Sequence, residues 1–325
     1  MKKLSLSIVL VFSSLQADQF YLQFYNDLFV KTDKHFTNGI NIGWIDHDSQ
    51  NSNQDITLYA QTLYSLASML NIPATKYNAG VSLSQYMFTP EDITQTQPQY
   101  DDFPYVGYLS VDFFLFAVHK NSFQEFRLSL GVVGKEAGAE WVQKTIHKIT
   151  GSTEPQGWDT QLGTNYSANI LYRYGNITWE KEFYDKWHVD WFNHIGFQAG
   201  NFLINAFAGS TFRIGYNYIQ NFNLHYPYLK EDASMLVIDK TNKGFGWALS
   251  LNINASALGY SYIIDEAQKQ GYDIEGNNFN PIFYSGMEVS YNRHKLTFFF
   301  QSQTPFLEQD KEFENFGGFN YVYNF

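Results

Sequence analysis

The sequence contains no cysteine, few charged residues and no long apolar run beyond its first residues. Without cysteine, the 325-residue chain can form no disulfide or zinc–thiolate site, and it has no thiol nucleophile. Charged residues make up only 16% of the chain. After residue 17 no apolar run reaches the roughly 18 residues that a transmembrane helix needs, which excludes a helical membrane protein. The net charge of −11 argues against nucleic acid as a partner, because phosphate binding needs clustered lysine and arginine.

Aromatic residues, by contrast, are abundant. Phe, Tyr and Trp make up 19% of the chain, although its mean hydropathy is −0.32. This aromatic content excludes a disordered chain. Residues 1–17 are typical of a signal peptide, because a lysine pair precedes the apolar stretch Leu4–Leu15 and Ala17 is small enough for cleavage before Asp18. An exported, aromatic-rich but polar chain indicates a barrel of the bacterial outer membrane, with residues 18–325 as its single domain.

Most of the chain alternates between apolar and polar residues, as the strands of outer-membrane barrels do. Aromatic residues occupy every second position from Phe319 to Phe325, and closure of the sheet would protect such an exposed edge from aggregation. The predicted fold class is all-β, a transmembrane antiparallel β-barrel of 12 strands. The predicted strands are 19–27, 36–46, 79–89, 105–118, 122–133, 166–182, 188–199, 203–218, 244–255, 281–292, 294–304 and 316–325. Residues 257–264 are assigned to a loop, with a thirteenth strand as the alternative.

Three predicted connections hold most of the unusual polar residues. If both termini lie on the periplasmic side, every loop that follows an odd-numbered strand lies at the extracellular rim. All three connections follow odd-numbered strands: 27–36, 89–105 and 133–166. At the first of them, Asn26-Asp27 and Thr37-Asn38-Gly39 bring carboxylate, amide and hydroxyl oxygens into one hairpin. The same residue types are common in turns without any function. Strand alternation points Asn26 outward and Asp27 into the lumen, unless a bulge brings both to one site.

The segment from Gly134 to Gly151 predicts an amphipathic helix at the extracellular rim, near residues 135–150. Its apolar stripe is formed by residues at helical spacing: Val142, Ile146 and Ile149. Gln143 and His147 lie one turn apart on the neighbouring face. A histidine held over the barrel wall is suited to act as a general base, whereas the alternative is a solvated histidine on a surface helix.

Several common catalytic motifs are absent from the sequence. It contains no G-x-S-x-G elbow, no H-E-x-x-H zinc helix and no phosphate-binding P-loop. Asp46-His47-Asp48 has side chains that bind metals, but its position predicts a solvated turn at the periplasmic end.

Taken in order, a set of short motifs resembles the outer-membrane lipid A 3'-O-deacylase family. The motifs are Asn26-Asp27, Thr32-Asp33, Thr37-Asn38-Gly39, Met87-Phe88-Thr89-Pro90, Pro104-Tyr105-Val106-Gly107-Tyr108, Gly131-x-x-Gly134, Gln143-x-x-x-His147 and Gly157-Trp158-Asp159-x-Gln161-Leu162. The resemblance implies a 12-stranded outer-membrane barrel that hydrolyses the ester-linked 3'-acyloxyacyl group of lipid A in a calcium-dependent reaction. The family's essential residues fall on Asn26, Asp27, Thr37, Gln143 and His147. Its acidic residue after the helix falls loosely on Glu154.

Two positions depart from the family pattern. The usual Asp-Arg-Pro-Tyr reads Asp102-Phe103-Pro104-Tyr105, so an expected cation is missing, and Asn165 stands where a glutamate is usual. The missing arginine bears on how a phosphate would be recognised rather than on the reaction.

The mechanism that follows from the resemblance is a hypothesis about five residues. His147 would take a proton from the attacking water, and a calcium ion near Asp27 would polarise the ester carbonyl. Asn26, Thr37 and Gln143 would orient these groups, and Thr37 as nucleophile is the alternative to water. The expected partner is lipid A or lipopolysaccharide in the outer leaflet, and the protein is expected to be a monomer. A passive porin and an outer-membrane phospholipase are the alternative functions.

Overall fold

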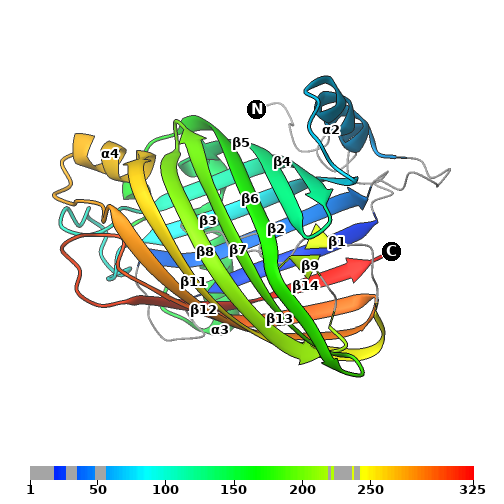
Figure 1. Ribbon diagram of the computed structural model, residues 1–325. Helices are drawn as coiled ribbons and strands as arrows, with labels where there is room; N and C mark the ends of the chain where they lie inside the picture. Colours follow the sequence, from blue (N-terminus) through cyan, green and yellow to red (C-terminus); the bar gives the residue numbers. More distant parts are fainter. Residues whose placement is uncertain (1–17, 27–34, 48–55, 219–220, 223–235, 238–241) are drawn as a thin grey trace.

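A computed structural model describes residues 18–26, 35–47, 56–218, 221–222, 236–237 and 242–325 (Figure 1). Within these residues, twelve antiparallel strands close into a barrel, which confirms the predicted fold class and strand number. The barrel strands are β1 (Gln19–Asn26), β2 (His35–His47), β3 (Lys76–Thr89), β4 (Val106–His119), β5 (Ser122–Val133), β6 (Asn165–Tyr184), β7 (Trp187–Gly200), β8 (Leu203–Tyr216), β11 (Asn242–Ser261), β12 (Phe279–Asn292), β13 (His294–Gln303) and β14 (Glu314–Asn324). The pairing of β1 with β14 closes the barrel, from Gln19 opposite Asn324 to Asn26 opposite Gly317.

The strand boundaries follow the sequence pattern closely except in β11. Residues 257–261, predicted as loop, continue β11 and pair with β8 as far as Ser261. The helix α4 (Tyr262–Lys269) begins directly after them. The prediction for this segment was therefore wrong, because pairing with a neighbouring strand, and not the local pattern, holds these residues extended. Two short strands outside the barrel, β9 (Asn221–Phe222) and β10 (Leu236–Val237), pair with each other.

Two further helices lie outside the β-sheet. The helix α3 (Ala139–Thr150) confirms the predicted helix near residues 135–150, whereas α2 (Leu58–Met69) was not predicted. Of the helices in the described residues, none is both long enough and apolar enough to cross a membrane. Asp46 is buried and accepts a hydrogen bond from the side chain of Thr57, the N-cap of α2. The prediction of a solvated turn was thus wrong for Asp46, which anchors a helix that the sequence pattern had not indicated.

The two ends of the barrel differ in their connections. At one end the first and last described residues meet, since the backbone N–H of Phe325 donates to the carbonyl oxygen of Asp18 at 2.8 Å. This end, the terminal rim, also carries the two-residue turns at 120–121 and 185–186, and α2 lies beside it (Figure 1). The opposite end, the loop rim, carries the connections 90–105, 134–164 and 262–278, with α3 and α4. Each rim has both short and long connections, since 48–75 and 217–241 also lie at the terminal rim and the turn 201–202 lies at the loop rim.

The lumen is filled with polar and charged side chains. Glu125 is buried between Arg127, whose Nη2 lies 3.0 Å from the carboxylate, and Arg173, whose Nε lies 2.9 Å away. A second buried pair joins Arg213 Nη2 to Asp190 at 2.7 Å. A wide water-filled channel would leave such side chains exposed. Their burial in the described part of the barrel argues against the alternative of an open porin.

The outer face of the barrel is apolar and exposed. It presents large side chains at alternate strand positions, among them Leu128, Ile170, Ile195, Ile253 and Phe298. An exposed apolar belt around a closed barrel matches the hydrocarbon layer of a membrane.

Candidate active site

The helix α3 lies on the outer side of the barrel wall rather than over its mouth. On β3, the side chains of Ser84 and Tyr86 point into the lumen, so Gln85 and Met87 point outward. Gln85 Nε2 donates a hydrogen bond to the carbonyl oxygen of Ala137 at 2.6 Å, and Met87 is buried against Ala139 of α3. The helix is therefore attached to the side of the barrel that faces lipid, at the loop rim.

Glycine allows the helix to approach the wall this closely. Gly107 on β4 lies under the helix, and a Cβ added there would be 2.8 Å from the Cβ of Ala139. The helix also begins and ends at glycines, since Gly138 and Gly151 have φ values of 69° and 73°. Only glycine adopts this left-handed conformation without strain. These residues determine where α3 starts, where it stops and how near the wall it lies.

The buried face of α3 is polar at its centre. Gln143 is 1% exposed, and its Oε1 accepts a hydrogen bond of 2.7 Å from Nε1 of Trp158. Trp158 in turn packs on Tyr105, with ring centroids 5.0 Å apart. Burial raises the pKa of Tyr105 to about 12, so its hydroxyl stays protonated and donates to the carbonyl oxygen of Ile93 at 3.1 Å. Gln143 Nε2 is buried and has no hydrogen-bond partner.

The apolar stripe of α3 is packed only in part. Val142 contacts the cluster around Trp158, whereas Ile149 is 79% exposed. A helix on the outer wall has lipid beside it, so an exposed apolar residue there needs no protein to cover it.

His147 is partly exposed and held by one backbone contact. Its Nδ1 lies within hydrogen-bond distance of the carbonyl oxygen of Thr153. A carbonyl can only accept, so the proton of the neutral ring lies on Nδ1, and Nε2 keeps its lone pair. This is the tautomer in which Nε2 can take a proton from another molecule. Glu154, the acidic residue next along the chain, is exposed.

The hairpin that carries the other predicted residues is described only in part. Asp27 and the side chains of Asn26 and Thr37 lie outside the described residues. The backbone of Asn26 pairs with Asn38 across β1 and β2. The pairing of β2 with β3 shifts register between Phe36 and Asn38, which leaves Thr37 as one extra residue. This β-bulge lies in β2, whereas the pairing of β1 is regular up to Asn26, so it is not the bulge that would have brought Asn26 and Asp27 to one face; bulges are nevertheless frequent next to active sites.

The bulge has a consequence for Asn38, a residue that sequence reasoning treated only as part of a turn. Without the extra residue, Asn38 would share the lumen face with Phe36. Instead it lies opposite Met87 on the outer face, one strand spacing of about 5 Å from it. Asn38 is 2% exposed, and both atoms of its amide are buried without a hydrogen-bond partner. Only the tertiary structure reveals this, because the sequence signal Thr-Asn-Gly is equally typical of a plain turn.

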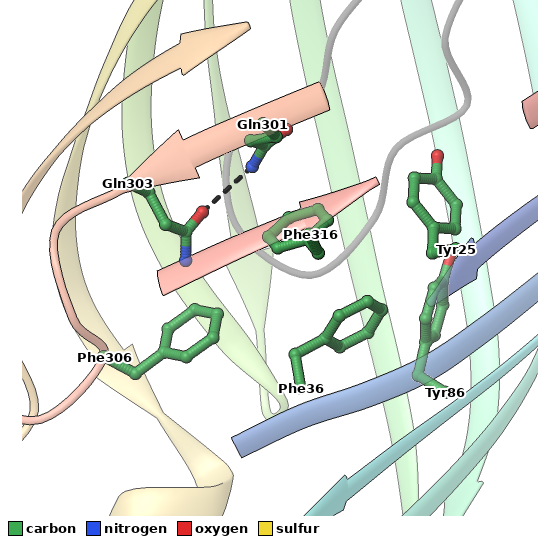
Figure 2. Close-up of a pocket in the computed structure, with 7 residues that line it drawn as sticks. All are labelled: Tyr25, Phe36, Tyr86, Gln301, Gln303, Phe306 and Phe316. Atoms are coloured by element: carbon green, nitrogen blue, oxygen red, sulfur yellow. Dashed lines mark hydrogen bonds between the residues drawn. The ribbon is translucent and has the colours of Figure 1, made fainter. Parts of the chain in front are cut away.

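The lumen behind this part of the wall is closed by aromatic rings. Figure 2 shows the side chains around a cavity of about 20 Å³, which has room for about one water molecule. The lining residues are Tyr25, Phe36, Tyr86, Gln301, Gln303, Phe306 and Phe316. Phe36 packs between Tyr25 and Phe316, with ring centroids 6.2 and 5.3 Å away. The polar residues on the outer face therefore have a rigid, nearly dry support on the inner face.

A cation could bind through oxygen atoms at this site. Among the described residues, no group of three or more histidine, aspartate or glutamate side chains could hold a metal ion. The unpartnered Oδ1 of Asn38 is, however, an oxygen donor of the type that calcium binds, and the backbone of Asn26 lies opposite it. The residues present are thus compatible with an oxygen-ligated cation, to which Asp27 would contribute its charge.

Comparisons with known proteins agree with the fold. The family described as "Outer membrane protein LpxR" matches residues 4–325. The chain belongs to the LpxR family of outer-membrane proteins. The structure of LpxR from Salmonella typhimurium is similar to it with a TM-score of 0.76 and 14% sequence identity, covering 94% of this chain and 100% of that one. The β domain of the Bordetella autotransporter BrkA matches with a TM-score of 0.48 and 10% identity, covering 95% and 99%. No curated protein sequence matches the chain.

One departure from the LpxR-family pattern now has a structural explanation. Phe103, which stands where an arginine was expected, is buried in the lumen against Phe88 and Phe306, with ring centroids 5.6 and 6.3 Å away. Phe103 fills the lumen at the loop rim, and its uncharged side chain cannot form an ion pair with a ligand. On α3, the side chain of Lys144 is paired with Glu140 at 2.8 Å.

The approach of α3 to the wall predicts the effect of a side chain at residue 107. Gly107→Val should push α3 away from β4, because its Cβ would overlap Ala139, while the strand itself accepts valine readily. We expect faster trypsin cleavage after Lys144 and Lys148 in the refolded barrel. Gly163→Ala is the control, since a Cβ at that glycine meets nothing within 4 Å. Equal cleavage rates in the two variants would contradict the predicted role of Gly107.

Proposed function

We propose that this LpxR-family protein removes the 3'-acyloxyacyl group of lipid A by hydrolysing its ester bond in the outer leaflet. The observation that carries the proposal is the position of α3. The helix holds His147 and Gln143 on the lipid-facing side of the wall, and the buried, unpartnered amide of Asn38 lies on the same face, opposite Met87, which packs against the helix. An active site for a soluble substrate would be expected in a cleft open to water, whereas these side chains lie on the face of the wall that contacts lipid.

His147 is the proposed general base. With its Nδ1 proton directed at the Thr153 carbonyl, Nε2 can accept a proton from a water molecule that attacks the ester carbonyl. The same proton is then available for the leaving alkoxide of the sugar. Thr37 as a direct nucleophile is the alternative, and it would be activated by the same ring.

The two unpartnered amides are suited to bind the oxygen on which negative charge develops. Gln143 Nε2 and Asn38 Nδ2 are both buried donors whose hydrogen bonds the protein itself does not satisfy. Leaving such a donor unpaired costs about 1–3 kcal/mol, a cost that a bound carbonyl or oxyanion would remove. Donors that are already oriented and shielded from water are the most effective stabilisers of an oxyanion.

A calcium ion, when bound, would polarise the ester carbonyl and so assist the attack. The ion would be held by Asp27, Asn26 and the side-chain oxygen Oδ1 of Asn38. The role of the protein residues is to exclude water, orient the ester and move the proton.

Substitution of the proposed base tests the reaction itself. Purified protein in detergent micelles with lipid A should release the acyloxyacyl group, seen by mass spectrometry as the corresponding loss from lipid A. His147→Ala should abolish release, while its barrel keeps the gel mobility of the folded form. His119→Ala, on β4 at the terminal rim, is the matched control and should retain full activity. A fully active His147→Ala variant would remove His147 from the mechanism.

Substitution of Asn38 should separate activity from stability. Asn38→Ala should lower kcat by about 10²–10³-fold, the usual loss for one oxyanion donor. It should not lower the urea midpoint of unfolding, because no hydrogen bond is lost. Asn41→Ala should lower the urea midpoint and leave kcat unchanged, since Asn41 faces the lumen and donates to Ser84. If Asn38→Ala unfolds more easily and keeps its kcat, Asn38 is a structural residue.

Removal of divalent cations tests the proposed calcium site. Activity should be lost after dialysis against EDTA and return on addition of Ca²⁺, while the barrel stays folded throughout. Asp27→Asn should raise the Ca²⁺ concentration needed for half-maximal activity. Undiminished hydrolysis in EDTA would overturn the calcium proposal but leave the hydrolase proposal standing.

A further inference from the structure

The helix α2 has three distinct faces. Ala60 and Ala67 are buried against Ala79 of β3 and Leu115 of β4. A second stripe, which is exposed and polar, consists of Gln61, Ser65 and Ser68. A third stripe is exposed but apolar: Leu58, Leu66 and Leu70 are 80%, 46% and 70% exposed. The helix Leu58–Met69 contains no charged residue at all. A helix with one polar and one apolar exposed face is matched to a boundary between water and hydrocarbon.

A large groove lies between the apolar stripe and the barrel wall. Its volume is about 1140 Å³, and its floor is formed by outward side chains of four neighbouring strands. These include Phe113 on β4, Leu128 on β5, Ile170 on β6 and Phe197 on β7. Leu128, Ile170 and Phe197 also belong to the exposed apolar surface of the barrel. The groove is therefore continuous with the surface that contacts membrane lipid.

The groove is preformed, because α2 is firmly attached. Thr57 caps the helix with its side chain and donates to Asp46. The hydroxyl of Tyr64 donates to the carbonyl oxygen of Asp46 at 3.0 Å, and Tyr77 donates to Ile72 beyond the end of the helix. These contacts join α2 to the end of β2 and the start of β3 at the terminal rim (Figure 1). The helix is thus held at a fixed distance from the strands that form the floor of the groove.

We propose that this groove binds the acyl chains of a membrane phospholipid, in the leaflet at the terminal rim. Twelve residues make a helix about 18 Å long, too short to cross a hydrocarbon layer of about 30 Å, so α2 lies along one leaflet. Lipid is favoured over a protein partner because the floor continues into the lipid-facing belt and because the apolar stripe has no charged residue to specify a protein. This site is independent of the proposed ester hydrolysis, since α2 and α3 lie at opposite rims.

The absence of cysteine makes a direct test possible. Leu66→Cys and Ser65→Cys place a single thiol on the apolar stripe and on the adjacent polar stripe. Each variant is labelled with bimane and refolded into phosphatidylcholine vesicles, with or without bromine on the acyl chains. Bimane at residue 66 should emit at shorter wavelength and be quenched severalfold more by brominated lipid than bimane at residue 65. Folding of each labelled barrel is checked by its gel mobility.

Two outcomes would overturn the proposal. Equal quenching at residues 65 and 66 would mean that the helix does not separate water from lipid. A blue-shifted label at residue 66 that brominated lipid does not quench would mean that protein covers the groove, and cross-linking would then identify a second copy. To exclude an effect of the label itself, Leu70→Cys is measured in the same way and should behave like Leu66→Cys, which lies one turn before it and also lines the groove.

Discussion

The alternation of strand side chains between lumen and lipid is the constraint on which the rest of this structure depends. Closure of β1 onto β14 leaves no free edge, so every inward residue must pack or pair inside the barrel and every outward residue must suit a membrane. Glu125 between Arg127 and Arg173 shows how charge is accommodated inside. Removing one member of such a buried group would leave a charge without compensation.

The candidate site arises where this alternation is interrupted. One extra residue at Thr37 turns Asn38 from the lumen face to the outer face. An amide on that face would otherwise be unfavourable, because hydrocarbon cannot bond to it. The side chain of Asn38 is nevertheless buried, and Met87 opposite it packs against α3, the helix that also holds the buried amide of Gln143. In the proposed function, these two amides form the polar site that the ester of a membrane lipid reaches.

The two helices outside the barrel wall use the lipid surface differently. At the loop rim, Gly107 lets α3 lie directly on the wall, so the space between them is small and polar groups are buried. At the terminal rim, α2 touches the wall through alanines on one side only and leaves an apolar groove on the other. The first arrangement suits chemistry on a polar group, and the second suits the binding of hydrocarbon chains.

The sequence by itself determined the closed barrel, its twelve strands and the helix that carries Gln143 and His147, because alternation and helical spacing are local properties of the chain. The extension of β11 to Ser261, the caps that hold α2 and the burial of Asp46 depended on residues distant in sequence. The same is true of the outer position of α3 and of Asn38. A bulge changes the face of a residue only relative to its neighbouring strand, and a helix shows its packed face only once the wall beside it is known. Those relations exist in three dimensions alone, so only the tertiary structure could decide them.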